Sequence, residues 1–336
     1  MSSTLETNIA KLNVVYNNSM SQLSKYYISQ YNAIRRSRMN ASQKQNYINS
    51  LNLYYKNQAS ILLNTLNLNI QKLRLEAAAT ATATLIGSAN KKALLIGCNY
   101  VATPYQLRGC INDAINIKNK LSSTYGFTNI KLMTDNTVQK PTRINIINEI
   151  TNLLANSVSG DILFILFSGH GTSFKDANND ELDGMDEYFV PLDFNRISDD
   201  EMKVIIQNNL KKDVKLLALF DSCYSGTVLD LKYQYLDRNN SNKTTVNDAC
   251  VETIGDVYLI SGCMDNQTSA DAFINNISQG AMSWAFLDTL NKSSSLTWNS
   301  LITNMCTSLK NSKYTQIPQL SSGKLLNING AFSMLN

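Results

Sequence analysis

The sequence predicts an α/β fold in which a mainly parallel β-sheet is flanked by helices and preceded by an all-α extension. Three observations predict it. The first 78 residues contain no glycine or proline, and their apolar residues recur at three- and four-residue steps. From Lys91 onward, short apolar runs alternate with amphipathic segments, as in a parallel sheet covered on both faces. Two of these runs, 162–167 and 216–220, lead directly into motifs rich in glycine and serine.

The N-terminal extension is predicted to be a helical hairpin or a short antiparallel coiled coil at 1–78. One apolar series runs through 5–34 and a second through 48–73, with a polar break at 39–42 between them. An Ala-Thr run and a Gly-Ser-Ala-Asn segment predict a linker at 79–92. Residues 1–90 hold nine Lys and Arg against two Glu. Because most of these basic residues are dispersed, we expect a solvated helix face and no nucleic-acid site.

The elements of the α/β part are expected in alternating order. Strands are expected at 93–97, 131–133, 162–167, 216–220 and 257–262, and helices at 112–125, 142–157, 199–212 and 281–291. The stretch 232–250 is polar and rich in Asn, Thr and Ser, so it predicts an exposed loop.

Composition excludes several classes of protein. The six cysteines show no close pairing, and no signal peptide is recognisable, which favours free thiols in a reducing compartment over a disulfide framework or a zinc site. No stretch approaches the roughly 18–20 apolar residues that a membrane span needs. We therefore expect a soluble, cytoplasmic protein with no membrane partner.

A histidine and a cysteine occupy equivalent places after two predicted strands. His170, the only histidine, lies in Ser168-Gly-His-Gly171 after the run 162–167, and Cys223 lies in Asp221-Ser-Cys-Tyr-Ser-Gly226 after the run 216–220. Side chains beyond neighbouring parallel strands meet at one edge of the sheet. A thiol with a free pKa of about 8.5 needs a nearby base, and histidine has an unperturbed pKa close to neutrality. The pair predicts a Cys-His catalytic site, although either residue alone reads better as a structural one.

Several segments, in a common order, resemble the metacaspases of the caspase-like clan of cysteine peptidases. They are 93–100, 107–114, 168–171, 186–193, 221–230 and 261–271. The resemblance covers about 93–336 and leaves the helical extension out. It implies a caspase-like fold with a large-subunit-like part at 93–231, a loop with processing sites at 232–250 and a small-subunit-like part at 251–336. It also implies a peptidase domain that is monomeric.

The resemblance implies a role for each residue of the site. Cys223 would be the nucleophile, His170 would transfer the proton, and the N–H groups of Gly171 and Cys223 would form the oxyanion hole. The pocket for the residue before the cleaved bond would accept Arg or Lys, because two carboxylates can hold a guanidinium by charge-assisted hydrogen bonds. The matching positions are Cys110, Asp113, Ser168 and Asp221. Asp113 could instead cap the helix that follows it.

The resemblance further implies a calcium site close to the active-site loops. The corresponding residues are Asp186, Asp199, Asp200 and Asp230. Clustered carboxylates suit calcium, which takes six to eight oxygen ligands. A solvated acidic loop is the alternative. An EF-hand at 176–187 is rejected, because the position that requires glycine is Glu181 and a strand is expected next.

Basic specificity together with basic linkers predicts autoprocessing of a zymogen. The candidate cleavage sites are Arg74, Lys91 and Lys92 before the peptidase part, and Lys232, Arg238 and Lys243 in the polar loop. Two other functions stay open. One is a scaffold or assembly protein that acts through its N-terminal helices. The other is a caspase-like peptidase with acidic specificity, against which the carboxylates of Asp113 and Asp221 argue because they would repel a substrate Asp.

Overall fold

A computed structural model describes most of the chain as two units. The units are residues 1–87 and 88–336, and each is described by itself. The described residues are 2–83, 90–175, 185–223, 228–235, 244–262, 271–274, 277–293 and 295–335. Of residues 2–5, 75–83, 271–274 and 277, the backbone alone is described.

The first unit is a hairpin of two long helices, α1 (Ser2–Arg36) and α2 (Ala41–Ala83). They pack through aromatic residues, with the rings of Tyr27 and Tyr55 centred 5.1 Å apart. The predicted all-α extension is thereby confirmed. Its boundary was wrong, because α2 continues through the first part of the expected linker. Alanine favours helix more than any other residue, which explains why the Ala-Thr run extends α2.

The second unit is built on an eight-stranded sheet with the strand order β2-β1-β3-β7-β10-β13-β8-β9. The first five strands pair in parallel and the last three pair antiparallel. In that order the strands are Asn129–Thr134, Lys91–Gly97, Ile162–Ser168, Lys215–Asp221, Asp256–Ser261, Gln319–Ser322, Tyr233–Gln234 and Thr245–Val246. The predicted α/β fold with a mainly parallel sheet is confirmed.

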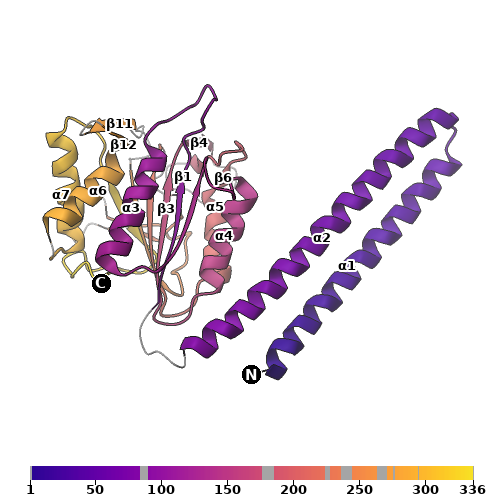
Figure 1. Cartoon of the computed structure of the whole chain (residues 1–336), viewed down its shortest axis with the longest axis horizontal. Coiled ribbons are helices and arrows are strands. Elements are labelled where there is room, and N and C mark those ends of the chain that lie inside the picture. Colours follow the sequence, from indigo (N-terminus) through magenta and orange to yellow (C-terminus); the bar gives the residue numbers. More distant parts are fainter. Residues whose placement is uncertain are drawn as a thin grey trace. The chain divides into compact units, whose positions relative to one another are not determined.

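Helices cover both faces of this sheet (Figure 1). On one face lie α3 (Cys110–Tyr125), α6 (Ala281–Lys292) and α7 (Trp298–Asn311), and on the other lie α4 (Arg143–Ala155) and α5 (Asp199–Asn209). Alternate residues of each strand enter the two cores. Leu95 of β1 packs with α3 and α6, whereas its neighbour Leu94 packs with α4 and α5. Both faces are therefore buried, which is why the strands read as continuous apolar runs.

The strand order reverses between β1 and β3. From β1 the chain goes outward to β2 and then returns to form β3 on the other side of β1. In open α/β sheets, ligands bind beyond the carboxyl ends of strands at such a point. Two small sheets complete the unit: β4 (Gly171–Lys175), β5 (Met185–Phe189) and β6 (Ile197–Ser198) form one, and β11 (Asp271–Ile274) and β12 (Ile277–Gly280) the other.

Lys91 and Lys92 do not belong to an exposed linker, as the sequence analysis expected. Both lie in β1 and are half-buried. The ammonium group of Lys92 is 2.7 Å from Asp161 Oδ2, and that of Lys91 donates to the carbonyls of Tyr125 and Leu335. Their long aliphatic stems lie along the sheet while their charged ends reach partners at its edge.

The expected exposed loop at 232–250 is also partly wrong. Residues 233–234 and 245–246 form β8 and β9 at the end of the main sheet. Tyr235, Asn247 and Cys250 are buried, and Lys232 is half-buried. Residues 236–243 lie outside the described ranges. No described helix is both long and apolar enough to cross a membrane.

Candidate active site

The two sequence motifs leave adjacent parallel strands in register. Ser168, the last residue of β3, pairs with Asp221, the last residue of β7. His170 and Cys223 each follow two residues later, so the sheet brings them to the same edge. The backbone continues the pairing, because the Gly169 N–H donates to the Asp221 carbonyl at 3.3 Å.

The glycine after the histidine allows the two motifs to touch. A Cβ atom on Gly171 would lie 1.9 Å from the carbonyl oxygen of Cys223, a distance that no side chain could accommodate. The sequence therefore needs glycine here, and the proposed oxyanion donors Gly171 and Cys223 lie side by side.

Cys223 differs from the other described cysteines near the sheet. It is half-buried, whereas Cys98, Cys110 and Cys250 are buried. Burial is the main reason that the pKa of Cys98 and that of Cys110 are raised well above their usual value. These two thiols stay protonated, which leaves Cys223 as the better-exposed thiol at this edge. Cys263 lies outside the described residues.

His170 is held by the loop that follows β1. Its ring Nε2 lies 2.7 Å from the carbonyl oxygen of Tyr105, and its backbone N–H donates to the Tyr100 hydroxyl at 2.9 Å. That hydroxyl donates in turn to the Val190 carbonyl at 2.5 Å. Burial raises the pKa of Tyr100, so its hydroxyl remains a donor. Sequence reasoning missed both tyrosines, because a backbone carbonyl and a hydroxyl bonded to backbone leave no residue-type signal.

The structure brings together the four residues expected in the specificity pocket. Asp113 accepts a 2.7 Å hydrogen bond from the Ser168 hydroxyl. Cys110 lies close to both carboxylates. Burial is the main cause of the raised pKa of its thiol, and the charges of Asp113 and Asp221 raise this pKa further. All four side chains are buried. Gly109, rather than Asp113, occupies the N-cap of α3, so the capping alternative for Asp113 is wrong.

The backbone of Gly280 lies close to the carboxylates of both Asp113 and Asp221. Its N–H donates to both oxygens of Asp113, at 2.9 and 3.0 Å. A Cβ on Gly280 would lie 2.1 Å from Asp221 Oδ2 and 2.7 Å from Asp113 Oδ2. Asp221 also accepts the Ser283 N–H at 2.8 Å. Gly280 and Ser283 were not predicted from the sequence, because they act through backbone N–H groups at the end of β12 and the start of α6, and backbone groups leave no residue-type signal.

A second group of carboxylates lies around the start of α5. Asp199 accepts the N–H groups of Glu187 and Asp200, at 2.6 and 2.8 Å. Burial raises the pKa of Asp199 to about 7, and the charge of Asp230 adds to the effect. Asp230 Oδ1 is buried and accepts no hydrogen bond among the described residues, while its Oδ2 lies 3.4 Å from the ammonium of Lys203.

The other expected calcium ligands have structural contacts of their own. Asp186 accepts a 3.3 Å hydrogen bond from the Tyr188 hydroxyl, and half-buried Asp200 lies in the first turn of α5, where acidic residues suit the helix dipole. Glu187, which sequence reasoning missed, is fully buried beside Asp199. Across the described ranges, no group of three or more His, Cys, Asp or Glu side chains is arranged to hold a metal ion. The fit to calcium therefore rests on Asp199 and Asp230, whose crowded carboxylates a hard cation would neutralise.

The candidate processing residues lie in different settings. Arg74 is exposed on α2, and Lys232 is half-buried before β8. Arg238 and Lys243 lie outside the described residues, as does 176–184 of the rejected EF-hand. Lys91 and Lys92 are built into the sheet, as described above.

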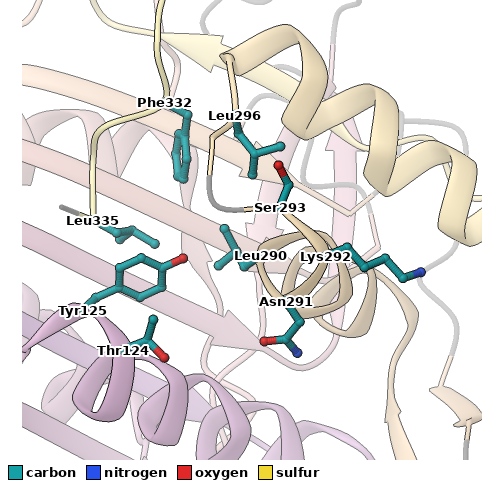
Figure 2. Close-up of a pocket in the computed structure, with 9 residues that line it drawn as sticks. All are labelled: Thr124, Tyr125, Leu290, Asn291, Lys292, Ser293, Leu296, Phe332 and Leu335. Atoms are coloured by element: carbon teal, nitrogen blue, oxygen red, sulfur yellow. The ribbon is translucent and has the colours of Figure 1, made fainter.

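A pocket of about 400 Å³ lies far from this chemistry. It is lined by the carboxyl ends of α3 and α6 and by the C-terminal segment, whereas Cys110 and Asp113 lie at the opposite end of α3. Figure 2 shows the rings of Tyr125 and Phe332 facing the pocket and the ammonium of Lys292 directed away from it. Without a converging set of charged groups, this pocket is no candidate for the catalytic centre.

Comparisons with known proteins identify the family to which the chain is similar. The sequence pattern described as "Metacaspase, peptidase C14 domain" matches residues 91–232. Metacaspase-1 of Kluyveromyces lactis is 38% identical over 295 residues, covering 72% of this chain and 68% of that protein. Metacaspase-1 of Saccharomyces cerevisiae is 38% identical over 298 residues, covering 73% and 69%. A crystal structure of a protein from Geobacter sulfurreducens aligns with a TM-score of 0.51 at 25% identity, over 69% of this chain and 93% of that one.

Proposed function

Because this chain belongs to the metacaspase family of cysteine peptidases, we propose that it is a calcium-activated endopeptidase that cleaves after Arg or Lys. The observation that carries the proposal is the convergence of the buried carboxylates of Asp113 and Asp221 beside the motifs of His170 and Cys223. A pocket floor with two negative charges suits a cationic side chain.

The partner of His170 indicates which ring nitrogen acts as the base. A carbonyl oxygen can only accept a hydrogen bond, so Nε2, 2.7 Å from the Tyr105 carbonyl, carries the proton in neutral His170. Nδ1 is then the basic nitrogen. It would take the thiol proton of Cys223, and the imidazolium would stay oriented by the Tyr105 carbonyl.

Cleavage then proceeds in two steps, formation of a thioester on Cys223 and its hydrolysis. The Sγ atom of Cys223 attacks the carbonyl carbon of the peptide bond, the C–N bond breaks, and the leaving nitrogen takes the proton from His170 Nδ1. Water then attacks the thioester, its proton passes to His170, and the acid product leaves as the thiol is restored. The N–H groups of Gly171 and Cys223 are positioned by close backbone approach and would stabilise the oxyanion in both steps.

Specificity would come from the carboxylates under the pocket. Asp113 is oriented by Ser168 and Gly280, and Asp221 by Ser283. The donors named here are neutral, and a guanidinium or ammonium entering the pocket would bring a positive charge to the two carboxylates. Two acceptors side by side favour the planar fork of Arg. The same charges oppose a substrate Asp, so the alternative of acidic specificity is disfavoured.

Calcium would act at the group that contains Asp199 and Asp230, with Asp186 and Asp200 nearby. The support is physical: a buried carboxylate with a pKa of about 7 and a buried oxygen of Asp230 are costly without a cation. Because β5 and β6 continue from the strand that starts at Gly171, calcium bound there would order the segment that carries the site.

Autoprocessing would convert a zymogen to the active form at exposed basic residues. Arg74 remains a candidate for release of the hairpin, and Lys232, Arg238 and Lys243 for cleavage before the small-subunit-like part. We expect the peptidase part to act as a monomer in the cytoplasm on protein substrates, in keeping with its free cysteines in the described ranges.

Reporter peptides ending in Arg, Lys or Asp before the cleaved bond test the proposal, each with Ca²⁺ or with a chelator. We expect cleavage of the Arg and Lys reporters in Ca²⁺, none in Cys223→Ala, and full activity in Cys306→Ala, which removes another half-buried thiol. Cleavage that survives in Cys223→Ala would refute Cys223 as the nucleophile. A preference for the Asp reporter would refute the proposed Arg and Lys specificity of the pocket. Equal rates with chelator would refute the calcium requirement. An inactive full-length protein that still assembles would favour the scaffold function.

A further inference from the structure

The helical hairpin has no buried core of its own. Among the side chains described in it, residues 6–74, none is buried, and all are half-buried or exposed. Ordering a residue costs about 1–2 kcal/mol of backbone entropy, and most helical stability in proteins comes from packing an apolar face. Two helices that bury no side chain do not meet that cost, so this hairpin needs a further surface to pack against.

The contact between the two helices follows a seven-residue repeat in α2. Ile48, Tyr55, Leu62 and Asn69 are half-buried at this spacing. Tyr55 marks the contact with α1, where its hydroxyl lies 3.1 Å from that of Ser24 and its ring meets Tyr27. These positions correspond to the a positions of a heptad.

A second apolar series runs directly beside this contact. The residue before each of the four is apolar and exposed, and the series forms a line along α2 that we call the α2 stripe. It consists of Tyr47, Tyr54, Ile61 and Leu68, whose side chains are 58%, 46%, 55% and 42% exposed. These are the g positions of the same heptads, so the stripe repeats with the same period as the seam.

The helix α1 adds to the same side of the hairpin. The ring of Tyr26 lies 5.9 Å from that of Tyr54, and Tyr26 is 49% exposed. Tyr26 immediately precedes Tyr27, whose ring meets that of Tyr55 in the seam, so Tyr26 holds a g position of α1. In an antiparallel pair the g positions of the two helices flank the seam on one side. Both helices therefore contribute to one apolar face.

Apolar residues at both a and g cover a wider part of the circumference of α2 than a two-helix seam needs, and this is the pattern of a helix with more than one helical neighbour. The hairpin supplies one neighbour to each helix. We propose that a second copy of this chain covers the α2 stripe, and that the two hairpins form an antiparallel four-helix bundle.

The size and charge of the face fit a second copy. Five large side chains, each about half exposed, offer about 100 Å² apiece, or roughly 1,000 Å² in total over two copies, which is about the area that a specific interface needs. The stripe contains no charged residue, so an acidic partner gains nothing there. Four of the nine basic residues of this part lie at the hairpin turn: Arg35, Arg36, Arg38 and Lys44. A two-fold antiparallel arrangement keeps the two turns apart by about the length of the helices, roughly 50 Å.

Sedimentation velocity of the full chain tests the proposal over a range of concentrations. A Cys223→Ala background keeps the chain intact, so the result does not depend on peptidase activity. We expect a species of twice 37.4 kDa. The double variant Tyr54→Lys/Ile61→Lys should be monomeric, with Kd raised at least 100-fold. The matched control Leu53→Lys, which alters an equally exposed leucine of α2 outside the stripe (60% exposed), should remain dimeric.

Hydrogen exchange provides the second measurement, since the double variant could also unfold the hairpin. In the Cys223→Ala chain, we expect amide protection within 44–74 to fall as the protein is diluted through the dimer Kd, while protection in β3 and β7 stays constant. A monomer at all concentrations, or amide protection that does not depend on concentration, would overturn the proposal and would indicate that the chain's own peptidase unit packs on the α2 stripe. Dimers of the double variant, dissociation of the control, or assemblies larger than two would overturn it as well.

Discussion

Replacing Asp221 with Asn separates charge from shape at the base of the pocket. The side chain amide keeps an oxygen that can accept the Ser283 N–H, now received by the carboxylate at 2.8 Å. Its NH₂ group then takes the place of Oδ1, which lies on the side of Gly262, 3.3 Å from where a Cβ on that glycine would be. The substitution should therefore retain the local structure and remove one negative charge.

The expected loss follows from the kind of bond that is removed. A hydrogen bond to a charged group contributes about 1.5–3 kcal/mol, and each 1.4 kcal/mol corresponds to about a tenfold change in rate. We expect kcat/KM for an Arg reporter to fall roughly 10- to 150-fold. Removing one of two neighbouring buried charges also relieves their repulsion, so thermal stability should stay unchanged or rise.

The assay compares an Arg reporter with a reporter that carries citrulline, its neutral counterpart of nearly equal shape. In the wild-type protein Arg should be strongly preferred, and in Asp221→Asn this preference should shrink by the same 10- to 150-fold factor. The alkylation rate of Cys223 by iodoacetamide serves as the control for an intact nucleophile. Equal losses for both reporters, or an unchanged preference for Arg, would refute the pocket argument.

Three further outcomes are expected. Gly280→Ala should abolish Arg cleavage in the reporter assay while preserving α6 by circular dichroism, because its φ of −68° suits alanine but the new Cβ would lie 2.1 Å from Asp221 Oδ2; undiminished activity would contradict the crowding. An acid whose pKa rises on folding loses stability as the pH increases from its ordinary pKa to the raised one. With the pKa of Asp199 at about 7 rather than 3.8, the melting temperature in chelator should fall between about pH 4 and 7, and less so in Asp199→Asn; parallel curves would count against it. Lys92→Met should lower the free energy of unfolding by about 1–3 kcal/mol in urea titrations, because the buried carboxylate of Asp161 loses its cationic partner and keeps only the N–H groups of Asn90 and Val158; a change below about 0.5 kcal/mol would show that the ion pair is dispensable.

Local patterns predicted the elements that depend on local patterns. The runs 162–167 and 216–220 became β3 and β7, because strands buried on both faces must be apolar throughout. The first 78 residues form two helices, as predicted, because apolar residues at three- and four-residue steps lie on one side of a helix. Neither α7 nor β13 was predicted, and Lys91 and Lys92 were expected in an exposed linker because they are charged.

The candidate site was predictable in part. The candidates His170 and Cys223 could be recognised by their residue types and their places after two strands, and Asp113 and Asp221 through the resemblance to the metacaspases. The Tyr105 carbonyl and the Gly280 N–H were not found, because every residue type offers a carbonyl and nearly every one an N–H, and position alone makes them functional.

By itself, the sequence determined which residues are available for chemistry, where the buried strands lie, and that the chain has two parts of different texture. Period and residue type are local properties, so they can be read without a fold. The tertiary structure decided which groups meet. Only the register of β3 with β7 brings Ser168 opposite Asp221. Only the packing of β12 against α3 places Gly280 beside the carboxylate of Asp113, which lies 167 residues earlier in the chain. Such contacts depend on chain topology, which no local pattern encodes.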